Sequence, residues 1–297
     1  MAQASVAAPS RGSDPIGVFD SGVGGLSVLR ALRAELPLER FIYVADSGHA
    51  PYGERDDTYV IRRSHAVMRY LMEAHQIKTL VVACNTATAA AIKQLRQDYS
   101  ELPIVGIEPA LKPAVKHSQT QHIGVLATRG TLGSEKFRLL LQSLQGQAHF
   151  VLQPCDGLAD AIERDDATKI AAACAQFTGA MGRFGTNPGD LDTLVLGCTH
   201  YPFANDVLRA LVGPSVAFLE GGAPVARQTQ RVLAERGWLA PQDKAARSDG
   251  DGGAGAGGGR GLAPPLHWLT TGDPASLQSA LQRWLQLRPQ VQPVTIA

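Results

Sequence analysis

The chain lacks the features that mark membrane-spanning, exported and disulfide-bonded proteins. Nowhere in its 297 residues do about 18 apolar residues follow one another, as a membrane-spanning helix would require. Residues 1–12 have neither a basic head nor an apolar stretch, so they do not resemble a secretory signal, and we expect residues 1–13 to form a flexible tail. The 4 cysteines have no regular spacing and do not indicate a disulfide framework. These absences favour a cytoplasmic protein with free thiols.

The chain also lacks an excess of either positive or negative charge. Lysine and arginine number 28 against 27 acidic residues, which leaves a net charge of +1 and little attraction for nucleic acid or an anionic membrane. The cysteines and histidines show no C-x-x-C or H-x-x-x-H spacing, so no metal site is predicted. Glycine is abundant instead, and it dominates residues 245–263, which we expect to form a flexible insertion.

The rest of the chain alternates short β-rich segments with longer helical ones, which is typical of parallel sheets covered by helices. The two halves of the chain repeat this order. We therefore predict an α/β fold of two pseudo-symmetric domains with mainly parallel central sheets and the active site in the cleft between them. Residues 14–108 plus 217–297 would form the first domain, and residues 109–216 the second. The segments expected to be strands are 16–19, 41–45, 80–83, 104–107, 123–127, 150–152, 194–196, 217–219 and 266–269.

Two cysteines end such strands in matching settings. Cys84 is followed by Asn85 and Thr86, and Cys198 by Thr199 and His200. A thiol at the beginning of a helix has a lowered pKa, and a nearby histidine can accept or hold its proton. Both cysteines are therefore candidate bases or nucleophiles. The other two cysteines have no such setting, and we interpret both as structural.

Two further polar turns follow predicted strands. The glycine-rich turn from Asp20 to Gly25 opens a helix, so its N–H groups could hold an anion, while the Asp20 carboxylate could contact an amine or orient a thiol. In the loop from Asp46 to Gly53, the backbone of Tyr52 and Gly53 could donate to a carboxylate. A hydrolase with a single Cys–His pair is an alternative, but it would leave the second cysteine unexplained.

Taken together, these residues resemble the cofactor-independent aspartate/glutamate racemase superfamily, and within it the glutamate racemases. The resemblance covers most of the chain from residue 16 to residue 232 in the family's order. It implies two α/β domains and a racemisation that uses two bases and no pyridoxal phosphate or other cofactor. The motifs that carry it are Gly17-Val-Phe-Asp-Ser-Gly-Val-Gly-Gly25, Asp46-Ser with Pro51-Tyr-Gly53, Ala83-Cys-Asn-Thr-Ala87, Gly124-Val-Leu-Ala-Thr128 and Gly197-Cys-Thr-His-Tyr-Pro202.

The resemblance also implies roles for single residues. Cys84 would remove the α-proton of D-glutamate and Cys198 that of L-glutamate, with Asp20, His200 and Glu163 assisting the thiols. Glu163 is placed by its spacing from Cys155, after which this chain lacks the family's proline. The residues that would hold the substrate's amine and carboxylates are Asp20, Ser21, Tyr52, Gly53, Asn85, Thr86, Thr199 and His200.

The same resemblance implies a biological setting. It points to L- and D-glutamate as substrates, D-glutamate supply for peptidoglycan precursors, and a homodimer as one form of assembly. Aspartate or hydantoin specificity is the nearest alternative, against which the Thr199-His200 pair favours glutamate. Some family members restrain DNA gyrase, but nothing in this chain indicates a surface for that role.

Overall fold

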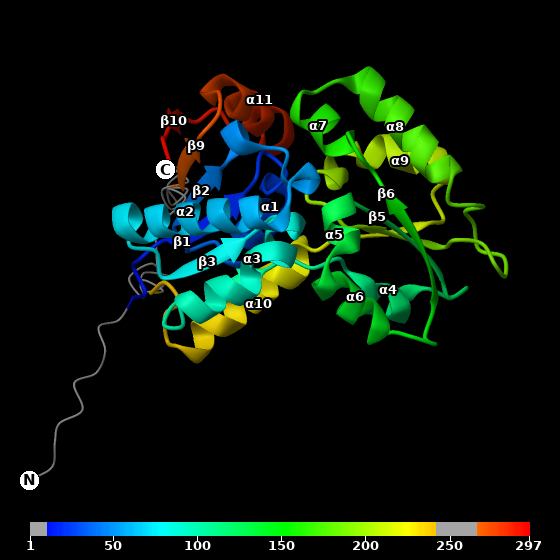
Figure 1. Cartoon of the computed structure of the whole chain (residues 1–297), viewed down its shortest axis with the longest axis horizontal. Coiled ribbons are helices and arrows are strands. Elements are labelled where there is room, and N and C mark those ends of the chain that lie inside the picture. The colour runs from blue at the N-terminus through cyan, green and yellow to red at the C-terminus, as the bar shows by residue number, and fades with distance from the viewer. Residues whose placement is uncertain (1–10, 242–265) are drawn as a thin grey trace, which may run out of the picture.

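The computed structural model describes residues 11–241 and 266–297, and these fold into two α/β halves that lie side by side (Figure 1). Residues 1–10 of the predicted tail and the predicted glycine-rich insertion lie outside the described residues. In the described part, the strands form a six-stranded and a four-stranded sheet, and all neighbouring strands run parallel. We call the parts built on them the first half and the second half.

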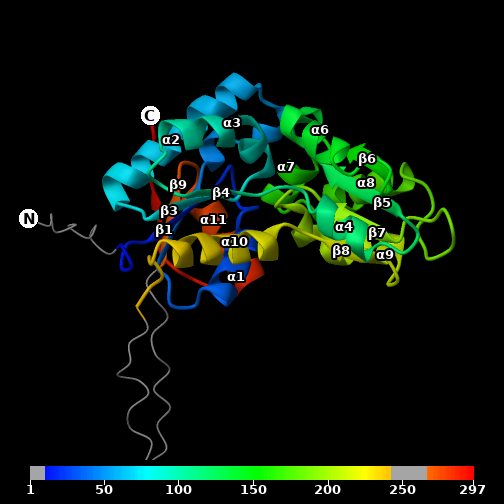
Figure 2. The ribbon, with the colours of Figure 1, turned by 90° about the horizontal axis from the view of Figure 1, so that it is seen from below.

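The sheet of the first half has helices on both faces. Its strand order is β10-β9-β2-β1-β3-β4. The strands are β1 (Ile16–Asp20), β2 (Phe41–Ala45), β3 (Thr79–Val82), β4 (Ile104–Gly106), β9 (Leu266–Thr270) and β10 (Val291–Pro293). One face packs on α1 (Leu26–Glu35), α10 (Gly222–Glu235) and α11 (Pro274–Leu285), and the other on α2 (Asp57–His75) and α3 (Asn85–Asp98) (Figure 2). Because both faces are covered, β1, β2 and β3 are buried along their whole length and are mostly apolar.

The second half is smaller and has the same layers. Its strand order is β6-β5-β7-β8, built from β5 (His122–Ala127), β6 (His149–Pro154), β7 (Thr193–Leu196) and β8 (Ala217–Leu219). Helices α4 (Leu111–His117) and α6 (Glu135–Gln142) cover one face, and α7 (Leu158–Glu163), α8 (Ala167–Gly179) and α9 (Asn205–Val212) cover the other. The short helix α5 (Arg129–Gly133) follows β5 and contacts the first half.

The two sheets match strand for strand, because β2-β1-β3-β4 and β6-β5-β7-β8 are the same topology. In each, the first strand lies between the next two strands of the chain, so the connections diverge and leave a crevice at the strands' carboxyl ends. The predicted pseudo-symmetric α/β fold is confirmed. One boundary differs: β8 pairs with β7, so residues 217–219 belong to the second sheet and not to the predicted first domain. The chain returns to the first half at α10, which packs against α1.

Candidate active site

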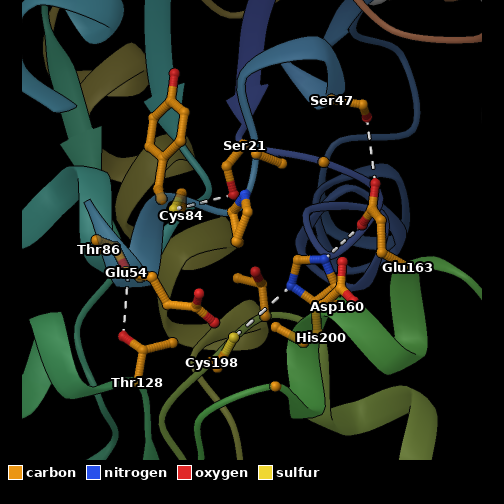
Figure 3. Close-up of a pocket in the computed structure, with 18 of the residues that line it drawn as sticks. Ser21, Ser47, Glu54, Cys84, Thr86, Thr128, Asp160, Glu163, Cys198 and His200 are labelled. Carbon is orange, nitrogen blue, oxygen red and sulfur yellow. Dashed lines mark hydrogen bonds and ion pairs between the residues drawn. The ribbon is translucent and has the colours of Figure 1, made fainter. Parts of the chain in front are cut away.

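A cavity of about 300 Å³ lies at the facing carboxyl ends of the two sheets. It is lined from both halves, and Figure 3 shows Cys84 and Cys198 approaching it from different sides. The structure brings together nearly all of the predicted site residues. Those on the cavity wall are Ser21, Tyr52, Gly53, Cys84, Asn85, Thr86, Glu163, Cys198, Thr199 and His200. Asp20 alone of the predicted set lies behind the wall, fully buried at the end of β1.

Cys84 lies two residues after β3 and caps α3. Its sulfur accepts a hydrogen bond from the Ala87 N–H at 3.4 Å, and its thiol donates to Ser21 Oγ at 3.7 Å. Burial, with a smaller contribution from the charge of Asp20, raises the pKa of Cys84 to about 12, although the Ala87 N–H acts in the opposite direction. The prediction of a lowered pKa is therefore wrong for Cys84, because desolvation outweighs the helix end. Cys84 is a neutral thiol at neutral pH.

Cys198 has a charged partner instead. Its sulfur lies 3.7 Å from Nδ1 of His200, and Nε2 of the same ring lies 2.7 Å from Oε2 of Glu163 (Figure 3). Burial alone would lower the pKa of His200, but its hydrogen bonds to Cys198 and Glu163 outweigh burial and raise it well above the ordinary value. The pKa of Glu163 is lowered, because hydrogen bonds from His200 and Val23 outweigh its burial. An imidazolium beside a sulfur stabilises the thiolate, so the two cysteines have different chemistry.

Asp20 is linked to both cysteine sites. Its Oδ1 accepts from the Gly22 N–H at 2.8 Å and from Ser21 Oγ at 3.5 Å, and its Oδ2 accepts from Thr199 Oγ1 at 3.0 Å. Complete burial raises the pKa of Asp20 to about 6, although His200 and the hydrogen bonds lower it in part. Asp20 reaches Cys84 through Ser21 and, with this pKa, is half-ionised near pH 6 and mostly ionised at neutral pH.

The glycine-rich turn after β1 is where the second half approaches the first. The Val23 N–H donates to both carboxylate oxygens of Glu163, at 3.2 and 3.0 Å. A Cβ on Gly22 would lie 2.5 Å from those same oxygens, and a Cβ on Gly24 would lie 2.4 Å from Nδ1 of His200. The turn was predicted to hold an anion, and the anion that it holds is a carboxylate of the chain itself.

The hydroxyl of Tyr52 is engaged by a buried carboxylate. The hydroxyl donates to Oδ2 of Asp46 at 2.5 Å, and Arg63 donates to the same carboxylate at 2.9 and 3.1 Å. Arg63 also donates to the carbonyl of Ile296 at 2.8 Å, which ties the end of the chain to this loop. That the Tyr52–Gly53 backbone donates to a carboxylate of the substrate stays a prediction.

Several cavity residues were not predicted as site residues, and two of them, Ser47 and Thr128, carry hydroxyl groups that join the halves. Ser47 donates to Oε1 of Glu163 at 3.2 Å, and the hydroxyls of Thr128 and Thr86 lie 3.1 Å apart across the two halves. Ser47 comes two residues after β2, and Thr128 directly follows β5. The rule that found the cysteines, a polar side chain just after a strand, would have found both.

The described part of the chain contains neither a group of side chains placed to bind a metal ion nor a helix suited to span a membrane. Within residues 11–241 and 266–297, no group of three or more histidine, cysteine, aspartate or glutamate side chains is placed to hold a metal ion. None of the helices described there is long and apolar enough to cross a membrane. All four cysteines are free thiols.

Comparison with known proteins decides the family. The family model described as Asp/Glu/Hydantoin racemase matches residues 25–229. The chain belongs to this family. It is thus an amino-acid racemase, an isomerase. A glutamate racemase from Ectopseudomonas mendocina is 48% identical over 235 residues, which are 78% of this chain and 87% of that protein. A glutamate racemase from Ralstonia pickettii is 41% identical over 287 residues, 97% of this chain and 93% of that one.

Solved racemase structures share the fold over nearly the whole chain. A glutamate racemase isoform from Bacillus anthracis superposes with a TM-score of 0.79 at 30% identity, covering 96% of this chain and 98% of that one. The Escherichia coli glutamate racemase, solved with L-glutamate and the activator UDP-MurNAc-ala, gives a TM-score of 0.75 at 26% identity, covering 96% and 99%. The racemase fold therefore extends over both halves.

Proposed function

We propose that the protein interconverts L- and D-glutamate, with Cys84 and Cys198 as two bases and without a cofactor. The observation that carries this proposal is that the two thiols reach one cavity from opposite halves, each at the end of equivalent strands β3 and β7. A proton removed from one face of a carbon and returned to the other requires a group on each side. The glutamate racemases that resemble the chain at 41% and 48% identity support glutamate as the substrate.

The thiols would act in sequence. With L-glutamate, the Cys198 thiolate beside the His200 imidazolium takes the α-proton, so the C–H bond breaks and an S–H bond forms. Cys84, a neutral thiol, then gives its proton to the opposite face, so its S–H bond breaks and D-glutamate forms. The reverse reaction starts with Cys84 as thiolate. Glu163 would assist by holding the proton of His200.

Neutral donors would stabilise the carbanion formed between the two steps. The α-proton is very weakly acidic, and proton transfer to a positioned base supplies only about 10²–10⁴-fold. Hydrogen-bond donors fixed at the substrate's carboxylates supply more, because negative charge flows onto them as the proton leaves. We assign these contacts, and those to the amine, to Asp20, Ser21, Asn85, Thr86, Thr199 and the Tyr52–Gly53 backbone, all of them on or directly behind the cavity wall.

Hydrogen exchange in D₂O tests the two-base proposal. The unaltered protein should racemise glutamate and place deuterium at Cα of both enantiomers. Cys84→Ala should exchange the α-proton of L-glutamate without racemising it, because Cys198 remains. Cys198→Ala should do the same to D-glutamate only. Exchange is measured because the two enantiomers have equal free energy, so kcat/KM for racemisation must be the same in both directions. Racemisation rates alone therefore cannot tell which thiol acts on which enantiomer.

The control for this experiment is Cys174→Ala, which removes a thiol buried in the second half and away from the cavity. It should racemise at the rate of the unaltered protein. Full racemisation by either cavity variant would refute the two-base proposal. A panel of glutamate, aspartate and hydantoins then tests the substrate, and we expect glutamate to be preferred.

We place this activity in the cytoplasm, where it would supply D-glutamate for peptidoglycan precursors. Free thiols at all four cysteines suit a reducing compartment. Cells that depend on this protein should grow after its depletion only when D-glutamate is provided. Assembly as a homodimer stays a prediction, which sedimentation of the purified protein would test.

A further inference from the structure

The carboxylate of Glu163 bridges the two halves of the molecule. Glu163 ends α7 in the second half, where its Oε2 lies 2.7 Å from Nε2 of His200. Its other contacts come from the first half: the Val23 N–H after β1, and the Ser47 hydroxyl after β2, which donates to Oε1 at 3.2 Å. Figure 3 shows this chain of contacts from Ser47 through Glu163 and His200 to Cys198.

Ser47 stands on a loop that is itself held in place. The preceding residue, Asp46, is fully buried, and its carboxylate binds Arg63, Tyr52 and the hydroxyl of Thr271, the last at 2.9 Å. The Ser47 hydroxyl therefore points at Glu163 from a position fixed by buried hydrogen bonds. A hydrogen bond from such a site orients its partner as well as binding it.

We propose that Ser47 is a positioning residue that holds Glu163 against His200 from the opposite half. Through this contact, the packing of the two halves against each other is coupled to the protonation of the Cys198–His200 pair. The inference deepens the proposed function, on which it rests, because it assigns the control of one of the two bases. Ser47 touches neither thiol and acts only through Glu163.

The linkage follows from hydrogen-bond chemistry. A hydroxyl and an N–H that both donate to Glu163 stabilise its ionised form, and both lie in the first half. An ionised Glu163 stabilises the imidazolium of His200, which in turn stabilises a thiolate at Cys198. Contact between the halves and protonation of His200 therefore favour each other, and such coupling is reciprocal.

Several charged groups face this chain of contacts. Asp20 at the end of β1 interacts electrostatically with both His200 and Glu163, Tyr43 of β2 with Glu163, and Cys198 with His200. On its own helix Glu163 is preceded by Asp160, which pairs with Arg164. Ser47 is neutral, so its removal alters the orientation of Glu163 without changing the charge of the site.

The pH dependence of racemisation by Ser47→Ala tests the proposal. Loss of the donor should raise the pKa of Glu163 and lower that of His200, so kcat/KM should form a narrower bell, with the acidic limb moved up and the alkaline limb moved down. At the optimum we expect a loss of about tenfold, the usual effect of one hydrogen bond to a charged group. Ser47→Thr, which keeps the hydroxyl, should restore the width.

Ser27→Ala is the matched control. Ser27 is buried, whereas Ser47 is half-buried, but the Ser27 hydroxyl also crosses between the halves, to the carbonyl of Thr199 at 2.9 Å, and it touches no titrating group. Its loss should lower kcat/KM by a constant factor at every pH. A Ser47→Ala profile that falls by a constant factor in the same way would overturn the proposal, since it would show a merely structural contact.

A second readout needs no turnover. NMR titration of the His200 ring, whose signal is identified by its absence in His200→Asn, should show the imidazolium losing its proton at lower pH in Ser47→Ala than in the unaltered protein. Titration curves that coincide would overturn the inference. If the unaltered protein fails to racemise glutamate, the proposed function fails, while this titration still decides the role of Ser47.

Discussion

Among single residues, Asp20 carries a carboxylate where water does not reach it. Its pKa of about 6 lies above the ordinary 3.8, so the folded state favours the protonated form. Its contribution to stability is full below the ordinary pKa and is lost as the pH rises through the folded one. The ionised group then costs about 3 kcal/mol, at 1.36 kcal/mol per pKa unit.

Asp20→Asn should therefore stabilise the protein above the folded pKa while it impairs racemisation. We expect the free energy of unfolding to rise by about 2–3 kcal/mol at neutral pH and to change little in acid. Urea unfolding across the pH range measures this difference. Curves for the two proteins that stay parallel over the whole range would contradict the assigned pKa.

The site requires a residue without a side chain at position 22, which is Gly22. Gly22→Ala would place a methyl group 2.5 Å from both carboxylate oxygens of Glu163, which must then move. A displacement of about 1 Å in a catalytic group can reduce kcat/KM by about 100-fold, and we expect a loss of that order. Gly133→Ala, where nothing lies within 4 Å of the added methyl, is the control and should retain full activity. Equal activities would show that Glu163 has no fixed place.

At the scale of elements, a buried ion pair joins α2 to the loop after β2 and to the end of the chain. Arg63→Ala would leave the Asp46 carboxylate, which is 0% exposed, without its cation. Breaking a buried pair in this way costs about 3–5 kcal/mol. Arg231→Ala, which breaks an exposed pair with Glu235, should change the free energy of unfolding by less than about 1 kcal/mol. Denaturant unfolding of both variants provides the comparison, and similar values would contradict it.

The strands could be predicted closely, because buried parallel strands are continuous apolar runs with clear ends. The segments 41–45 and 217–219 match β2 and β8 residue for residue. The helices were harder. Helix α10 begins with Gly222-Ala-Pro224, which has the composition of a turn, and its helical state depends on packing against α1. Between α5 and α6, the single residue Ser134 both ends one helix and caps the next by accepting from the Phe137 N–H.

At the scale of the whole molecule, the two halves share the cavity that holds both thiols, so a ligand there should stabilise both halves together. Glutamate at 100 times its Kd should raise the free energy of unfolding by about 2.7 kcal/mol. Calorimetry should show a single transition that moves to higher temperature with D- or L-glutamate but not with lysine, which lacks the second carboxylate. A transition that splits, with only one part moving, would show that the ligand contacts a single half.

The relation between the halves is the part that sequence reasoning could describe only in outline. The repeated order of strands and helices predicts two sheets and a site between them. The contacts that join the halves carry no local pattern, because Glu163 and Val23 are 140 residues apart and Ser27 and Thr199 are 172 apart. The role of Glu163 came from resemblance alone, and only the fold explains how its carboxylate reaches the glycine-rich turn.

Because the two thiols have unequal partners, one arrangement of protons on them is favoured at the start of a turnover. Under the proposed mechanism, conversion of L-glutamate leaves Cys198 protonated and Cys84 as a thiolate, the form that its pKa of about 12 disfavours. After each turnover, which of the two thiols carries the proton therefore depends on the enantiomer that was consumed. The two thiols return to their starting protonation either when the opposite enantiomer is converted or when water entering the cavity exchanges protons with them. At saturating substrate, the rate of this return sets an upper limit on turnover that neither thiol sets by itself.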